Sequence, residues 1–187
     1  MKKLAVVSMS VLFAFIVNNL QAQVNGQEQA NLTKKELKTE RKVIRNPEVS
    51  YVSKFSKNNF YTDFGNIPNV EWSKDANFDM ATFTENGQKT EAFYDHDANL
   101  VGTTTLKSFA DLPAKSQQEI KSRYKDYSIG QVILFDDNES NDTDMVLYGT
   151  PFNDADNYFV ELKKGNEKIV VRVDETGFVY FFKNLSM

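Results

Sequence analysis

Oxygen-bearing side chains concentrate in one short stretch of the sequence, where acidic and amide residues alternate. At every second position the side chain offers an oxygen that suits Ca²⁺: Asp136, Asn138, Ser140, Asp142 and Asp144. An EF-hand loop would need Gly at its sixth position and Glu at its twelfth, but this stretch has Asn141 and Leu147 there. The stretch therefore predicts a solvated insertion loop, a weak Ca²⁺ site of another kind, or an acidic finger that meets basic groups of a partner. In the third interpretation the partner-binding residues are Asp136, Asp137, Glu139, Asp142 and Asp144.

The composition excludes several kinds of catalytic centre. The 187-residue chain has no Cys and a single His, so thiol nucleophiles, disulfides and multi-His metal centres cannot form within it. His96 lies between two Asp residues at a predicted turn, where we expect a solvated side chain. A carboxylate-dependent hydrolase would need two carboxylates about 5–9.5 Å apart in a cleft, and the sequence singles out no such pair among its 26 Asp and Glu. We therefore expect a non-enzymatic protein with no cofactor and no metal centre, and keep the hydrolase as an alternative.

The first 46 residues differ in composition from the rest of the chain. Two lysines precede an apolar run over residues 4–17, which is too short to span a membrane, and the small residue Ala22 follows it. This layout predicts a signal peptide over residues 1–22 and hence a periplasmic or secreted protein without a membrane span after cleavage. Residues 23–46 carry six Lys or Arg against three Glu, which predicts a basic flexible leader, either a solvated spacer or an electrostatic tether to anionic lipid or to the acidic body. The body, residues 47–187, carries 14 basic and 23 acidic residues, net −9, which argues against nucleic-acid binding.

The body shows the same pattern twice, at a spacing of 78 residues. Ala81–Gly87 resembles Phe159–Gly165, and each segment is followed by two further extended runs. A helical pattern precedes each unit, at about residues 47–60 and residues 113–127, the second opened by Asp111 as N-cap. A helix followed by an antiparallel meander, present twice, predicts an α+β fold with the helices on one face of the sheet and with halves at about 47–108 and 109–187.

The strands of the second half predict which residues lie on each face. The turn Asp174–Gly177 suits a hairpin with Gly177 in the left-handed region, which pairs Asp174 with Phe178. Under the helices we then expect Val160, Leu162, Ile169, Val171, Val173, Val179 and Phe181. On the other face, which we expect to be open for a partner, lie Phe159, Val170, Phe178, Tyr180 and Phe182. In the first half Ala98 occupies the position of Gly177, where a left-handed conformation costs about 1–2 kcal/mol, so we expect that turn to be one residue longer with Asn99 left-handed.

The order of these segments resembles the bacterial β-lactamase-inhibitor-like family, whose members carry PepSY-like repeats. The similar segments are Ile67-Pro-Asn-Val-Glu-Trp72, Ala81–Gly87, Glu91-Ala-Phe-Tyr-Asp95, Asp111-Leu-Pro113, Tyr127-Ser-Ile-Gly-Gln-Val132 and Asn157-Tyr-Phe-Val-Glu-Leu162. The resemblance implies two tandem helix-plus-four-strand units that share one sheet with an open concave face. It also implies non-catalytic protein binding. We therefore expect a partner protein of the cell envelope or exterior, with a small-ligand or Ca²⁺-binding module as the alternative.

Overall fold

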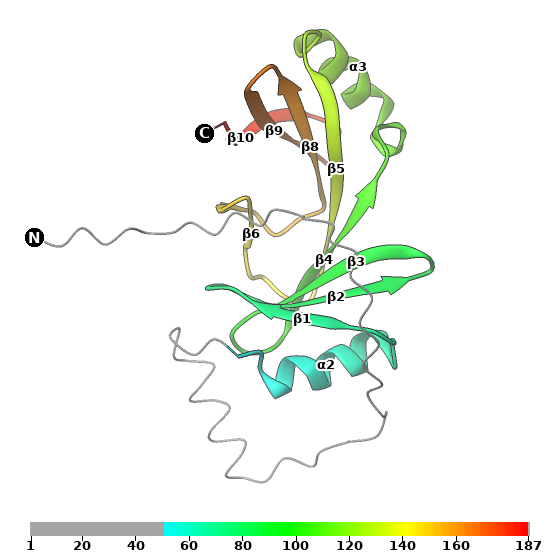
Figure 1. Ribbon diagram of the computed structural model, residues 1–187, viewed down its shortest axis with the longest axis vertical. Coiled ribbons are helices and arrows are strands. Elements are labelled where there is room, and N and C mark those ends of the chain that lie inside the picture. Colours follow the sequence, from blue (N-terminus) through cyan, green and yellow to red (C-terminus); the bar gives the residue numbers. More distant parts are fainter. Residues whose placement is uncertain (1–50, 187) are drawn as a thin grey trace, which may run out of the picture.

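The computed structural model describes residues 51–186 and contains two α-helices and ten strands in that range (Figure 1). The helices are α2 (Lys54–Phe64) and α3 (Ala114–Arg123). The strands are β1 (Glu71–Lys74), β2 (Asp79–Glu85), β3 (Gln88–Tyr94), β4 (Leu100–Lys107), β5 (Ser128–Asp137), β6 (Met145–Leu147), β7 (Thr150–Phe152), β8 (Asn157–Lys164), β9 (Glu167–Asp174) and β10 (Val179–Asn184). The predicted signal peptide and leader, and the start of the predicted first helix, lie outside the described residues.

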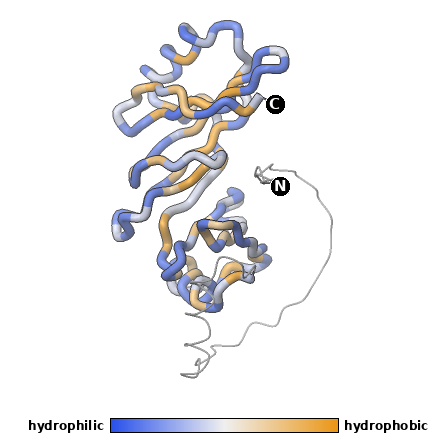
Figure 2. The backbone as a smooth tube through the Cα atoms, turned by 90° about the vertical axis from the view of Figure 1, so that its left-hand side faces the viewer, coloured by the Kyte–Doolittle hydropathy of each residue, from blue (hydrophilic) through white to orange (hydrophobic). Residues whose placement is uncertain are grey.

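Eight strands form one antiparallel sheet in the order β1-β2-β3-β4-β5-β8-β9-β10. Each half of the described chain supplies a helix and then four strands of this sheet, and the halves join where β4 pairs with β5. The register places α2 and α3 on the same face, because the strand residues that pack on each helix follow one alternation across the sheet. Hydrophobic backbone segments run mainly along the strands and hydrophilic ones at the turns (Figure 2). The predicted α+β fold with helices on one face is therefore confirmed, whereas the tandem-repeat relationship of the halves stays a prediction.

Helix α2 begins and ends later than the predicted range of residues 47–60. Ser53 is its N-cap: the Ser53 hydroxyl accepts a hydrogen bond from the Phe55 N–H at 3.0 Å. The helix ends at Gly65, which adopts φ +75° and donates its N–H to the Tyr61 carbonyl. It packs Phe60 on the first half of the sheet, with ring-centroid distances of 5.0 Å to Phe83 and 5.5 Å to Trp72.

The predicted start of the second helix needs a correction. Asp111 is not the N-cap of α3; it belongs to a short 3₁₀ helix, Phe109–Asp111, and its carboxylate accepts hydrogen bonds from the Ser108 N–H and hydroxyl. Pro113 stands at the N-cap of α3, which ends at Arg123 rather than at Tyr127. The buried Ser116 hydroxyl donates to the Gly177 carbonyl at 2.9 Å and so fastens α3 to the turn between β9 and β10.

The helix-side core of the second half follows the prediction except at Phe181. Six of the seven predicted residues are buried in one cluster with Leu112 and Ile120. Phe181 is 60% exposed, although its pairing with Val171 places it on the same face. It lies on β10, the last strand of the sheet that residues 51–186 form, and beyond Val179, whose carbonyl accepts a hydrogen bond from Arg123 of α3.

The opposite face is not open in the way the sequence predicts. Strands β6 and β7 form a separate hairpin whose Met145 and Phe152 bury Phe159 and Val170 completely. Phe182 is partly buried against the same cluster, with its ring centroid 4.9 Å from that of Phe159. The prediction that these three residues form an exposed docking surface is therefore wrong, because the chain's own hairpin occupies the place expected for a partner.

The two β-turns that follow β3 and β9 have equal length. In the second, Val179 pairs with Val173 and Gly177 adopts φ +79°, as predicted. In the first, Ala98 itself adopts φ +65°, which contradicts the longer turn expected there. The turn forms because the Asp95 carboxylate accepts hydrogen bonds from the Asp97 and Asn99 N–H groups at 2.9 Å each, and because Ala98 is buried.

Candidate binding groove

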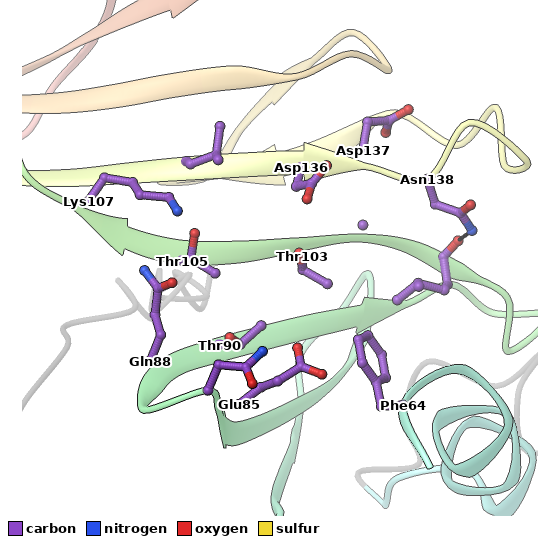
Figure 3. Close-up of a pocket in the computed structure, with 14 residues that line it drawn as sticks. Phe64, Glu85, Gln88, Thr90, Thr103, Thr105, Lys107, Asp136, Asp137 and Asn138 are labelled. Atoms are coloured by element: carbon purple, nitrogen blue, oxygen red, sulfur yellow. Dashed lines mark hydrogen bonds between the residues drawn. The ribbon is translucent and has the colours of Figure 1, made fainter. Parts of the chain in front are cut away.

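A groove lies over the central strands of the sheet beside α2, and among the described residues no part of α3 lines it. Helix α2 packs mainly on β1–β3, and α3 packs on the last strands and on Val132 of β5, which leaves most of β4 and the end of β5 without a helix over them. The groove has a volume of about 420 Å³. In Figure 3 its floor shows Thr103, Thr105 and Lys107 from β4 and Asp136 from β5, with Phe64 of α2 at one side.

The polar side chains on this floor are not used by the fold. Within residues 51–186, the side chains of Thr103, Thr105, Lys107 and Asp136 form no hydrogen bond or ion pair with another residue. Thr103 faces Asp136 across the β4–β5 ladder, whereas Thr105 faces Leu134, so the polar side chains follow β4 and the Asp136 carboxylate lies beside one end of them. Because a strand points every second side chain to one face, the sequence Thr103–Lys107 sends three polar groups into the groove. These groups can donate and accept hydrogen bonds to a bound molecule.

The groove has a negative balance of charge. The charged residues that line it are Glu85, Asp136, Asp137 and Lys107. Burial raises the pKa of Asp136, the nearby Asp156 raises it further, and Lys107 partly offsets both. Lys107 is therefore close enough to Asp136 to act on its charge, and the groove offers one cation among three carboxylates.

A second carboxyl pair closes one end of the groove. Burial raises the pKa of Asp137 to about 7, assisted by a hydrogen bond to Asp154 and by the negative charges of Glu139 and Asp156. The Oδ1 atoms of Asp137 and Asp154 are both buried and have no N–H or other donor among the described residues. The two carboxyl groups therefore lie against each other at the end of the groove.

The predicted acidic finger is fastened to the first half of the molecule. The Asn138 and Asn141 amides donate to the Leu100 carbonyl at 2.7 and 3.0 Å, and Asn141 also donates to Asp95. The Oδ1 atoms of Asn138 and Asn141 accept hydrogen bonds from backbone N–H groups two residues further along the loop, so both amide side chains stabilise the loop itself. No group of three or more His, Asp or Glu in residues 51–186 is placed to hold a metal ion.

The predicted site residues lie in separate places. Asp136 and Asp137 line the groove, whereas three more of the acidic residues are exposed on the loop beyond it: Glu139, Asp142 and Asp144. Phe178 and Tyr180 are 50% and 44% exposed at the far edge of the sheet, where Lys115 lies over the Phe178 ring at 3.5 Å. The sequence analysis missed Thr103, Thr105 and Lys107. Their signal is a polar stripe along a predicted strand, on the face that should be apolar if a helix covered it.

Two helices on one face of an eight-stranded antiparallel sheet, with a groove beside the first, define an α+β protein with a BLIP-like (β-lactamase-inhibitor-like) fold. A BLIP-like protein from Bacteroides fragilis has a TM-score of 0.57 and 18% identity, over 76% of this chain and 94% of that chain. A DUF2874 family protein from Bacteroides uniformis has a TM-score of 0.60 and 16% identity, over 73% and 91%. A proposed periplasmic protein from Bacteroides eggerthii gives 0.59 and 16%, over 73% and 91%.

These likenesses confirm the fold that the sequence resemblance implies. No protein-family model and no curated protein matches the chain, and the PepSY-like relationship stays a prediction. None of the helices formed by residues 51–186 has the length and apolarity that a membrane crossing requires.

Proposed function

We propose that this protein is an exported, non-catalytic binding protein that holds an extended segment of another envelope protein in the groove over β4 and β5 beside α2. The observation that carries the proposal is the floor of the groove, where the side chains of Thr103, Thr105, Lys107 and Asp136 form no hydrogen bond or ion pair within the described residues. Polar groups that neither the fold nor a helix uses are suited to a ligand that brings its own donors and acceptors.

An extended peptide fits the shape and chemistry of this floor. Hydroxyl groups repeat along β4 at every second residue, which matches the spacing at which an extended peptide presents its amide groups. The volume of about 420 Å³ falls in the range of ordinary ligand sites, but the floor is more polar than that of a typical cofactor pocket. The excess of carboxylates favours a segment that contains Lys or Arg and speeds its encounter with the groove.

Export and the absence of catalysis rest on separate arguments. The predicted signal peptide and the proposed periplasmic relative support a location outside the cytoplasm. Neither His nor Cys lines the groove, and its end carries the Asp137–Asp154 pair in mutual contact rather than separated by a substrate. The groove therefore supports binding better than the carboxylate-dependent hydrolysis kept as an alternative.

A matched pair of variants tests this function. The protein is used to capture its partner from envelope extract, the bound segment is mapped with synthetic peptides, and its Kd is measured by calorimetry. Thr105→Arg places a long side chain on the floor of the groove and should weaken binding at least tenfold. Tyr180→Ser, on the exposed far edge, should leave the Kd unchanged. Equal binding by wild type and Thr105→Arg, or loss only with Tyr180→Ser, would contradict the groove as the binding surface.

A further inference from the structure

The basic leader joins the body beside the acidic end of the groove. The first described residues lead into Ser53, whose N–H donates to Asp79 at 3.0 Å, and α2 then donates from Asn59 to the Ala98 carbonyl at 2.7 Å. The turn that contains Ala98 leads directly into Leu100, which lines the groove and accepts hydrogen bonds from the acidic loop. The start of the described chain therefore lies near the strand ends where Asp137 and Asn138 close the groove.

The length of the leader allows its basic residues to reach the groove. Only five residues lie between Arg45 and Tyr51, which places the two at most about 20 Å apart along an extended chain. The basic positions that precede it spread over nine residues, about 26–29 Å, and are Lys34, Lys35, Lys38, Arg41 and Lys42. The floor of the groove from Thr103 to Lys107 is shorter than either span. The basic residues of the leader can therefore reach the groove without any change in the structure of the body.

The charges of the two parts are complementary. Residues 23–46 carry a net charge of +3 and the body carries −9, and the groove itself has three carboxylates against Lys107. A short tether gives a local concentration in the millimolar range, so even a weak contact is populated when it is intramolecular. A partner protein that binds the groove through its own Lys or Arg must compete with this contact between the leader and the groove.

We propose that residues 34–45 of the same chain occupy the groove and act as an intramolecular competitor that the partner segment must displace. This inference rests on the proposed function, because it assigns the regulation of the same groove. Lys and Arg of the leader lie against Asp136, Asp137 and Glu85, and its extended backbone takes the place of the partner's on the threonine floor. A partner with a weak affinity is then excluded, which narrows the set of proteins that bind.

The chain's lack of Cys permits a direct test with the form that begins at Gln23. A nitroxide is attached to Thr39→Cys, and the amide signals of the isotope-labelled protein are recorded by NMR. We expect strong broadening at Thr103 and Thr105 and none at Thr176, in the turn at the far end of the sheet. A matched variant with its leader Lys and Arg changed to Gln should lose the broadening at the groove. Equal broadening at Thr103 and Thr176 would overturn the inference.

Two further arms separate the possible outcomes. Nitroxide-labelled protein without isotope is mixed with isotope-labelled protein without nitroxide; groove broadening of full strength in this mixture would show that a second copy is the occupant and would overturn the inference. The leader variant should also bind the mapped partner segment at least tenfold more tightly. If groove broadening is absent while Thr105→Arg still weakens partner binding, only the leader inference fails. If the leader occupies the groove but Thr105→Arg binds the partner normally, the proposed function fails.

Discussion

Replacing Phe152 by Ala tests whether the β6–β7 hairpin is part of the core. Phe152 is 4% exposed, and its ring centroid lies 5.2, 4.8 and 6.0 Å from those of Phe135, Phe159 and Phe182. Removing a buried ring with several aromatic neighbours leaves a cavity, so Phe152→Ala should lower the free energy of unfolding by about 3–5 kcal/mol. For a folded part of this size that loss lowers the melting temperature by about 10–15 °C.

Urea unfolding gives the measurement with two independent probes. Trp72 packs on Phe60 in the first half, so its fluorescence reports that half, while far-UV circular dichroism reports the whole sheet. The control is Phe181→Ala, which removes a ring of the same size that is 60% exposed and should change stability by less than about 0.5 kcal/mol. If Phe152→Ala costs no more than Phe181→Ala, the hairpin does not bury this face and the reasoning fails.

Three other substitutions have expected outcomes that can be measured in the same way. Gly102→Ala should cost about 1–3 kcal/mol in urea unfolding, because an added Cβ would lie 2.6 Å from the Phe135 ring; a neutral effect would contradict this packing. Asp79→Ala should cost about 3–5 kcal/mol, since it leaves the buried Ser53 N–H and Ser56 hydroxyl, and the partly buried Lys74 ammonium at 2.7 Å, without their acceptor; a loss below about 1 kcal/mol would show that the carboxylate is dispensable. Burial raises the pKa of Asp137 to about 7, above the value of about 4 for an unfolded chain, so its contribution is complete below about pH 4 and is lost as the pH rises through 7. Urea titrations from pH 4 to 8 should therefore fall less steeply for Asp137→Asn than for wild type, and parallel profiles would refute a raised pKa.

Much of the second half could be predicted from the sequence, because local rules govern it. The alternation of Val171 and Val173, and the glycine that a left-handed turn position favours, determine the β9–β10 register that the structure shows. The same rules failed at Ala98, where a buried methyl group and two hydrogen bonds to Asp95 hold a conformation that the residue type disfavours. Propensity is a weak guide where side-chain contacts with the rest of the fold oppose it.

The hairpin and the groove could not be found in the same way. Met145–Leu147 directly follows the acidic stretch of residues 136–144, which the sequence favours as a solvated loop, so nothing marks a strand there. The available signal was the dipeptide Tyr148-Gly149 between short apolar runs, and both of these residues adopt positive φ, as a tight two-residue turn requires. The groove depends on how far α2 and α3 extend over the sheet. The extent of the helices over the sheet follows from the packing of both halves. In the sequence, only the polar stripe of β4 indicates the groove.

The apolar cluster beneath the β6–β7 hairpin draws its side chains from both halves, with Phe78, Phe93 and Val101 on one side of the β4–β5 junction and Ile133, Phe135, Phe159 and Val170 on the other. Neither half can melt without exposing the other's rings to water, so the calorimetric and van 't Hoff enthalpies of the body should coincide. The same apolar cluster resists any bending of the sheet about β4 and β5. An incoming segment thus meets a floor already in place and spends none of its interaction energy on rearranging it.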